Sequence, residues 1–376
     1  MIIKNGNVLN DGFRFMIADV KVKGEKISDI GENLCGDDVI EADGCYVVPG
    51  FIDTHMHGAL ANTFIDYTDD TARIISEYEA KNGTTSLVPA ISAAKREKLE
   101  KVCDHMNKCM GFSNDKCALI HGFHLEGPFF SLKYKGAHLP ENIRVPSVDE
   151  LSAYVGISGK NIKIITIAPE LDGAEETIKY AVKNGICVSV GHTDATYEDV
   201  VNAEKWGATQ ATHLFNAMSA LNHRAPNAVG GALGSEAIKC ELICDFFHVH
   251  PTVVKLAYKI KGRNKINMIT DSEIGTGLPD GEYDVNGRKI IVKNNQTRCE
   301  DGTIAGGTTC LIDGVRNLVS IGIPLEDACM MASKNPALTA NIYDKTGSIT
   351  VGKTADILIL DKELKLKHVI LRGKIL

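Results

Sequence analysis

The stretch YVVPGFIDTHMHG (46–58) decides how the chain is read, because it is a short apolar run that ends in an aspartate and two histidines. Seven further runs rich in Val and Ile follow it: 85–91, 118–126, 162–168, 186–192, 209–215, 241–247 and 266–271. Helical-period stretches lie between most of them: 70–82, 95–110, 148–156, 174–183, 197–205 and 251–261. Apolar strands alternating with amphipathic helices are typical of a parallel sheet covered on its faces. Eight such units over about 290 residues predict an α/β fold, a (β/α)8 TIM barrel over 49–343.

Both ends of the chain have a different pattern from the middle. Residues 1–48 and 344–376 consist of short, partly alternating strands separated by turn signals such as Asn-Gly and Asp-Gly. We expect them to pair into one small β-sandwich domain built from both chain ends. Residues 282–304 carry similar turn signals and predict a β-hairpin inserted after the eighth strand.

Composition excludes several classes of protein. A net charge of −7 over 376 residues supplies no basic field for a phosphate backbone, so no nucleic-acid partner is expected. No apolar run reaches the ~18 residues that a membrane helix needs, and the N-terminus has no secretory h-region. The 11 cysteines are scattered without a CxxC pair, which is typical of reduced thiols in a cytoplasmic protein.

Six of the eight predicted strands end in a histidine or a carboxylate. The positions are His55 and His57, His124 and Glu126, His192 and Asp194, His213, His248 and His250, and Asp271. In a TIM barrel the carboxyl ends of all strands open on one face, where active sites are built. These side chains are therefore expected to converge on one small volume.

Imidazole and carboxylate groups are ligands of zinc and of harder divalent metals. His55 and His57 are two residues apart, so they point to the same side of an extended chain and can bind one ion. A bound metal lowers the pKa of its water toward 7, and a nearby carboxylate can transfer the proton to a leaving group. Asp271 is the natural candidate for that transfer and Glu126 for a metal ligand. The pattern predicts metal-assisted hydrolysis of an amide, ester or C–N bond.

Four motifs carry a resemblance to a known family: PGFIDTHMHG (49–58), HGFHLEGPF (121–129), SVGHTDATY (189–197) and ATHLFNAM (211–218). They resemble the amidohydrolase superfamily and, within it, the N-acetylglucosamine-6-phosphate deacetylases, in which a glutamate replaces the carboxylated lysine of related enzymes. The likeness extends over nearly the whole chain, including PDGEYDVNG (279–287) and GSITVGKTADILILD (347–361). It implies deacetylation of N-acetylglucosamine 6-phosphate in amino-sugar catabolism.

The resemblance also implies roles for individual residues. One or two divalent ions per subunit (Zn, Fe, Mn or Co) are implied, the main one held by Glu126, His192 and His213 and a second near His55, His57 and Asp271. Asp271 is implied as general base and acid, and His138 as the group that polarises the acetyl carbonyl. Substrate contacts are implied for Ala137, His138, Asn216, Ala217, Arg224, His248, Ile304, Ala305 and Gly306. Arg224 would bind the 6-phosphate. His248 reaches the substrate in the family from the neighbouring subunit, so a homodimer is implied.

Three segments depart from the family pattern: ALANTFIDYTDD (59–70), NHRAPNAVGG (222–231) and SEIGTG (272–277). They bear on sugar specificity, because these loops line the sugar. A deacetylase of another N-acetylated sugar phosphate, such as N-acetylgalactosamine 6-phosphate, is therefore an alternative. A dihydroorotase-type amidase would want a lysine where Glu126 stands. A catalytically dead scaffold barrel would have lost part of the metal set, which is complete here.

Overall fold

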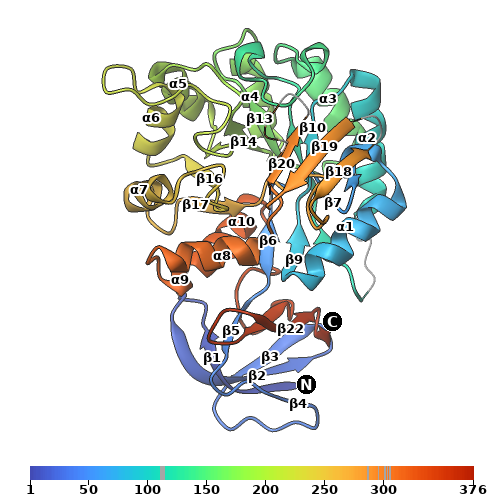
Figure 1. The fold of residues 1–376 in the computed structure, drawn as a ribbon, viewed down its shortest axis with the longest axis vertical. Coiled ribbons are helices and arrows are strands. Elements are labelled where there is room, and N and C mark those ends of the chain that lie inside the picture. The colour runs from blue at the N-terminus through green and yellow to red at the C-terminus, as the bar shows by residue number, and fades with distance from the viewer. Residues whose placement is uncertain (111–114, 286–287, 295, 300–301, 303, 305) are drawn as a thin grey trace.

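The structure is a computed structural model that describes residues 1–376 except 111–114, 286–287, 295, 300–301, 303 and 305. A large unit of parallel strands ringed by helices is joined to a smaller, all-β unit that contains both chain ends (Figure 1). The predicted TIM barrel with an additional β domain is confirmed.

The barrel is built from ten short strands that follow the eight predicted runs. They are β6 (Phe51–Asp53), β9 (Thr84–Leu87), β10 (Ala90–Ser92), β11 (Leu119–Ile120), β12 (Phe123–Glu126), β13 (Ile162–Ile167), β14 (Cys187–Val190), β15 (Gln210–Ala211), β16 (Lys239–Ile243) and β17 (Ile266–Ile269). The parallel order runs β6-β9-β11 in one sheet and β10-β12-β13-β14-β15-β16-β17 in the other. The second and third runs are each interrupted, so the barrel wall is continued by β10 and β12 beyond the breaks.

The first and last strands are joined near the site by hydrogen bonds outside regular pairing. The backbone N–H of Asp271 donates to the carbonyl of His55 at 2.9 Å, and that of His57 donates to Ser272 at 2.7 Å. The Thr270 hydroxyl donates to the buried Asp53 carboxylate at 2.6 Å. The ends of the first and eighth strands are thus held side by side.

Helices cover the outside of the barrel, most of them between consecutive strands and three in succession after the last. They are α1 (Asp69–Lys81), α2 (Arg96–Cys109), α3 (Val148–Ile157), α4 (Ala174–Lys183), α5 (Tyr197–Trp206), α6 (Asn227–Gly234), α7 (Pro251–Lys261), α8 (Leu311–Ser320), α9 (Leu325–Ala332) and α10 (Lys334–Thr339). Our helix pattern did not include α8, α9 and α10, nor α6, whose three glycines lower helix propensity. Packing explains α6: a Cβ on Gly231 would lie 2.8 Å from the Val200 Cβ, so only glycine allows this approach to α5.

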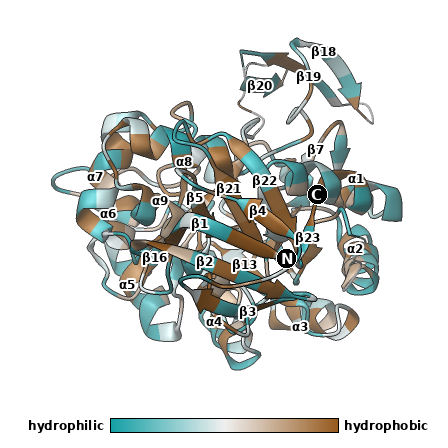
Figure 2. Ribbon diagram, turned by 90° about the horizontal axis from the view of Figure 1, so that it is seen from below, coloured by the Kyte–Doolittle hydropathy of each residue, from teal (hydrophilic) through white to brown (hydrophobic). Residues whose placement is uncertain are grey.

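The chain ends form one hydrogen-bonded sheet of eight strands. Its strands are β1 (Ile2–Leu9), β2 (Phe15–Lys23), β3 (Lys26–Gly31), β4 (Val39–Glu41), β5 (Tyr46–Pro49), β21 (Ile357–Leu360), β22 (Leu366–Leu371) and β23 (Lys374–Ile375). Buried residues from both ends, Val20 and Ile357 among them, share a core separate from that of the barrel. Figure 2 shows this sheet in front of the ring of helices. The run 46–53 is therefore divided, with β5 in the small sheet and β6 in the barrel.

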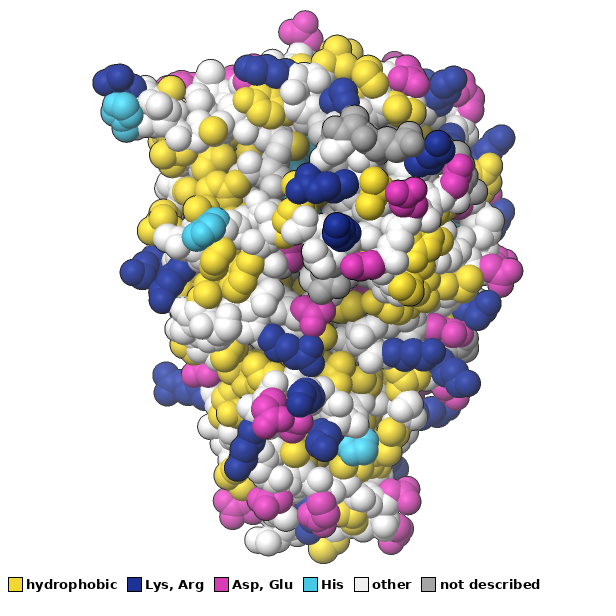
Figure 3. All heavy atoms as spheres, viewed as in Figure 1, with side chains coloured by type: hydrophobic (Ala, Val, Ile, Leu, Met, Phe, Trp, Pro, Cys, Tyr) yellow, Lys and Arg dark blue, Asp and Glu magenta, His cyan; other side chains and the backbone are white. Residues whose placement is uncertain are grey.

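The predicted insertion after the eighth strand is present as three antiparallel strands, β18 (Gly281–Val285), β19 (Arg288–Lys293) and β20 (Gln296–Cys299). Among the described residues, no helix has the length and apolarity needed to cross a membrane. No disulfide joins the 11 cysteines, and Cys240 and Cys244 lie in the barrel core. On the face in Figure 3, basic and acidic side chains are intermixed rather than gathered by sign.

Candidate metal centre and active site

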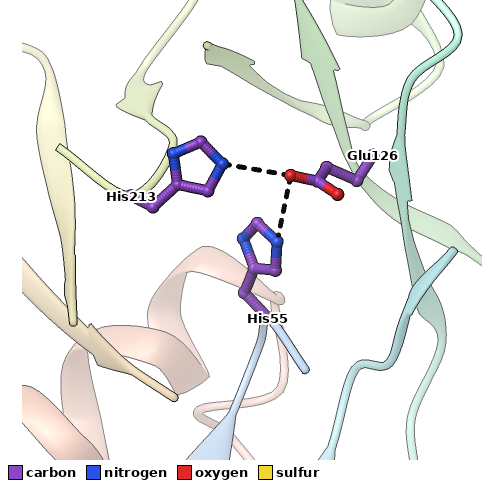
Figure 4. A group of neighbouring side chains, drawn as sticks. All are labelled: His55, Glu126 and His213. Atoms are coloured by element: carbon purple, nitrogen blue, oxygen red, sulfur yellow. Dashed lines mark hydrogen bonds and ion pairs between the residues drawn. The ribbon is translucent and has the colours of Figure 1, made fainter. Parts of the chain in front are cut away.

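The predicted strand ends converge on the carboxylate of Glu126, at the tip of β12. Five imidazoles have a ring nitrogen within 3.4 Å of its two oxygens: His55 (3.4 Å), His192 (2.9 Å) and His213 (3.1 Å) at Oε1, and His57 (3.2 Å) and His138 (3.4 Å) at Oε2. Figure 4 shows His55 and His213 approaching the same oxygen from different strands. The Glu126 side chain is only 3% exposed, so it is enclosed by these rings.

The opposite nitrogen of four of these rings is held by a partner. Nδ1 of His192 is 2.8 Å from the Tyr134 carbonyl, and Nδ1 of His213 is 3.1 Å from the Asn216 carbonyl. Nδ1 of His55 is 2.8 Å from Glu241, and Nδ1 of His57 is 3.0 Å from the Ser92 hydroxyl. A carbonyl only accepts, so in His192 and His213 the proton lies on Nδ1 and the Nε2 lone pair points inward.

The nitrogen and oxygen atoms that face the centre of the cluster are arranged to bind a cation rather than one another. Nε2 of His192 and Nε2 of His213 are 3.1 Å apart, and both face one oxygen of Glu126. Three electron-pair donors so close together repel unless a positive charge lies between them. In three groups of side chains, the possible ligand atoms all lie within 4.8 Å of one another: Glu126–His138–His192, His55–Glu126–His213 and His55–His57–Asp271. The residues present could therefore hold one or two divalent ions.

Charges in the side chains themselves support this reading. Burial would raise the pKa of the Glu126 carboxyl, but the histidines around it, His55 first, hold that pKa well below its usual range. Burial would lower the pKa of His57, yet hydrogen bonds to Asp271 and Glu126 raise it to about 10. Burial lowers the pKa of His192 to about 4. The carboxylates therefore stay ionised and attract positive charge to this point.

Several residues of the centre adopt left-handed backbone conformations. The φ angles are +48° at His192, +26° at His213, +48° at Ala217 and +49° at Asp271. Such conformations are unfavourable for residues other than glycine and persist only where surrounding contacts enforce them. Hydrogen bonds such as that from Asp271 N to His55 O hold these turns, so the strand ends are bent to aim side chains inward.

Asp271 differs from Glu126 in being more open. Its Oδ1 lies 3.3 Å from His57 Nε2 and 3.6 Å from His55 Nε2, and its side chain is 16% exposed. Burial would raise its pKa, but the hydrogen bond to His57 and the charge of His55 lower that pKa below its usual range. Asp271 is thus an ionised carboxylate at the open side of the cluster.

His138 joins the cluster from the loop after β12. Its side chain is 11% exposed and its Nε2 faces Glu126. Ala137, next to it, is exposed. Gly136 in the same loop has a φ of +59°, and a Cβ there would lie 3.2 Å from the His192 ring. The loop therefore packs directly on a candidate ligand.

Asn216 supports His213. Its carbonyl lies 3.1 Å from His213 Nδ1, and its backbone N–H and side-chain amide both donate to the His213 carbonyl. The Ala217 carbonyl accepts from the backbone N–H of Thr193. Sequence reasoning assigned Asn216 and Ala217 to substrate contact; the structure adds that Asn216 fixes the orientation of a candidate metal ligand.

Arg224 and His248 lie outside the cluster around Glu126. Arg224 is exposed in the turn Asn222–Ala225, and its guanidinium forms no ion pair with the part of the chain that the structure describes. His248 Nδ1 is 2.7 Å from Asp245 of the same chain. Burial would lower the pKa of His248, but the bond to Asp245 raises it, helped by the charge of Asp271.

Gly306 lies against the turn of Asp271. Ile304 forms a bridge with Arg298, and a Cβ on Gly306 would be 2.8 Å from the Asp271 carbonyl. The next residue, Gly307, donates its N–H to that carbonyl at 2.7 Å. The predicted contact residue Ala305 is outside the described residues.

Sequence reasoning missed Glu241, which is fully buried and binds His55 from inside the barrel. It also did not assign a role to Asp53, whose carboxylate accepts from the backbone N–H of His55 and from Thr270. The available signal was a charged residue at the start of the apolar run 241–247, since a buried charge needs a partner.

Comparisons with known proteins agree with the geometry. Residues 46–376 match the Amidohydrolase family. The chain is 35% identical over 378 residues to an N-acetylglucosamine-6-phosphate deacetylase of Lysinibacillus sphaericus, covering 100% of this chain and 97% of the relative. It is 30% identical over 339 residues to an N-acetylgalactosamine-6-phosphate deacetylase of Escherichia coli O157:H7, covering 90% and 89%. A Mycobacterium smegmatis deacetylase mutant, solved in complex with N-acetyl-D-glucosamine-6-phosphate, superposes with a TM-score of 0.94 at 30% identity, covering 100% and 98%.

Proposed function

Because this chain belongs to the amidohydrolase family, we propose that it hydrolyses the acetamido group of N-acetyl-D-glucosamine 6-phosphate, releasing acetate and D-glucosamine 6-phosphate. One observation carries the proposal: five imidazoles surround the carboxylate of Glu126 at the carboxyl ends of the barrel strands. Relatives with this activity match the chain over its full length.

We assign the metal ligands from two observations: the 2.9–3.1 Å distances among Glu126 Oε1 and the Nε2 atoms of His192 and His213, and the donor set His55–His57–Asp271. Glu126, His192 and His213 would hold the main ion, and His55, His57 and Asp271 would hold a second one that shares Glu126. When bound, a divalent metal polarises the amide carbonyl and lowers the pKa of water. The same oxygen and nitrogen donors suit Zn, Fe, Mn and Co, so availability decides which one is taken up.

The exposure of the two carboxylates separates their roles. Glu126 is 3% exposed and surrounded by rings, which suits a metal ligand, whereas Asp271 is 16% exposed and can meet substrate. Asp271 would take a proton from the attacking water and return it to the amine nitrogen as the C–N bond breaks. His138, at the edge of the cluster, would donate a hydrogen bond to the acetyl oxygen.

Binding of the sugar phosphate would depend on loops around the barrel mouth. Arg224 is an exposed guanidinium after β15, and such a group binds phosphate with paired hydrogen bonds. The other proposed contacts to the sugar phosphate are Ala137, Asn216, Ala217, His248, Ile304, Ala305 and Gly306. N-acetylgalactosamine 6-phosphate is the alternative substrate, since relatives with that activity match at 30–31% identity.

We further propose that the protein is a cytoplasmic homodimer. The loop that follows Glu126 exposes three apolar side chains, Leu132 (62%), Leu139 (58%) and Val145 (59%), and exposed apolar residues grouped on one loop favour a protein contact. The absence of disulfides among 11 cysteines fits a reducing compartment. Sedimentation equilibrium tests the dimer, and a monomer at all concentrations would refute it.

The decisive experiment is an activity panel. N-acetylglucosamine, N-acetylgalactosamine and N-acetylmannosamine are offered with and without a 6-phosphate, each with Zn, Fe, Mn or Co. We expect acetate release to be fastest with N-acetylglucosamine 6-phosphate. Faster release from the galactosamine isomer would establish the alternative. No release with any sugar or metal, together with no bound metal, would instead indicate a scaffold barrel.

A further inference from the structure

Glu241 lies in the middle of β16 and is fully buried inside the barrel. Its Oε2 is 2.8 Å from His55 Nδ1 and accepts from the backbone N–H of His213 at 3.2 Å. Its Oε1 accepts from the side-chain amide of Gln210 at 2.7 Å. One carboxylate therefore contacts the ring of one candidate metal ligand and the backbone of another.

The contact with His55 decides which way that ring faces. Because Glu241 holds Nδ1, the opposite nitrogen Nε2 points to Glu126 and Asp271, at 3.4 Å and 3.6 Å. This Nε2 is buried and has no hydrogen-bond partner among the described residues. A carboxylate behind an imidazole fixes its tautomer and makes the far nitrogen a stronger metal donor.

Glu241 is itself held in place from behind. Gln210, which donates to it, accepts from the Asn267 side chain at 2.7 Å, and Asn267 also donates to the Thr339 hydroxyl at 2.9 Å. Thr339 ends α10, outside the barrel wall. A chain of buried and partly buried hydrogen bonds thus runs from the outer helix layer to His55.

We propose that Glu241 is a positioning residue, which orients His55 and thereby sets the affinity of the ion held by His55 and His57. This inference rests on the proposed function, which it deepens. The effect falls mainly on that ion, since the ring of His213 is oriented by Asn216 instead.

Glu241→Gln tests the charge without removing the side chain. The amide oxygen can still accept from His55 and His213, while its NH₂ group faces Gln210. Flipping the amides of Gln210 and Asn267 by 180° then restores the donor–acceptor order of the chain, so the variant should fold. Glu79→Gln is the matched control: Glu79 is also fully buried, but it lies in α1 and its carboxylate contacts no candidate ligand among the described residues.

The experiment is a zinc titration of chelator-treated full-length protein, with bound metal measured by elemental analysis and affinities by competition with a chelating dye. We expect two ions per chain in wild type and Glu79→Gln. In Glu241→Gln the first should bind as in wild type, and the second about 10–100-fold more weakly. If Glu241→Gln binds both ions with the same affinities as wild type, the inference is overturned.

A second measurement decides the matter even if zinc uptake fails. In metal-free, chelator-treated protein, proton NMR should show a slowly exchanging resonance from the His55 Nδ1–H. This resonance is assigned by its loss in His55→Asn. It should shift or exchange faster in Glu241→Gln and stay unchanged in Glu79→Gln. An unchanged signal in Glu241→Gln would refute the positioning role. Wild type that shows this signal but binds no metal would refute the proposed function and leave the hydrogen bond established.

Discussion

Replacing Asp271 with asparagine should abolish most turnover while leaving the protein folded and the main ion in place. Asparagine has the same shape, so its side chain can occupy the same place beside His57 (3.3 Å) and His55 (3.6 Å). What it loses is the negative charge and the ability to accept a proton. At 16% exposure, Asp271 is the more open of the two carboxylates at the centre, so no neighbouring carboxylate can take over.

The size of the effect follows from that loss. A positioned general acid–base group contributes roughly 10²–10⁴-fold to the rate, which is ~2.7–5.4 kcal/mol of transition-state stabilisation at about 1.36 kcal/mol per tenfold. Because asparagine still hydrogen-bonds, KM for N-acetylglucosamine 6-phosphate should change far less than kcat. The ion at Glu126, His192 and His213 should remain bound.

The test measures turnover by steady-state acetate release and bound metal by elemental analysis, both on the same preparation. Asp194→Asn is the control, since Asp194 follows His192 closely but pairs with exposed Lys133 at 2.9 Å. Its loss should change kcat by less than about fivefold, as expected for an exposed ion pair. If Asp271→Asn keeps more than about a tenth of wild-type turnover, Asp271 does not transfer the proton.

Three further predictions follow from other parts of the molecule. Arg224→Ala should lower kcat/KM for the 6-phosphorylated sugar by roughly 10–200-fold, because a hydrogen bond to a charged group contributes about 1.5–3 kcal/mol; an equal loss on the unphosphorylated sugar would show that Arg224 does not recognise phosphate. With metal in excess, wild type should hold two ions per chain and His57→Ala one, measured by elemental analysis; wild type that never exceeds one ion would contradict the second site. Burial raises the pKa of Glu79 from 4.5 to about 8, so the folded protein keeps a proton that the unfolded chain releases. The free energy of unfolding should therefore fall between pH 4.5 and 8, by up to roughly 4–5 kcal/mol. Urea unfolding should show a smaller pH dependence of this free energy in Glu79→Gln than in wild type, and an unchanged pH dependence would refute the prediction.

Much of the barrel could be predicted because its signals are local. Each apolar run and each helical stretch is set by the period of neighbouring side chains, and the structure places strands or helices in all of them. Four helices, α6, α8, α9 and α10, were not predicted. In α6 the glycines are favoured by the close approach to Val200, which lies 31 residues away from Gly231 in sequence. The run 46–53 was divided between two sheets for a similar reason, since β5 pairs with β21 from the far end of the chain.

By itself, the sequence determined which side chains gather at the candidate site. The histidines at 55, 57, 192 and 213 and the carboxylates at 126 and 271 stand at strand ends, and the barrel geometry brings strand ends together. Only the tertiary structure decided how those side chains are aimed. The partners that orient the rings, Glu241 for His55 and the carbonyls of Tyr134 and Asn216 for His192 and His213, come mostly from distant parts of the chain. A hydrogen bond depends on distance and angle in three dimensions, so no spacing in the sequence encodes which acceptor each imidazole meets.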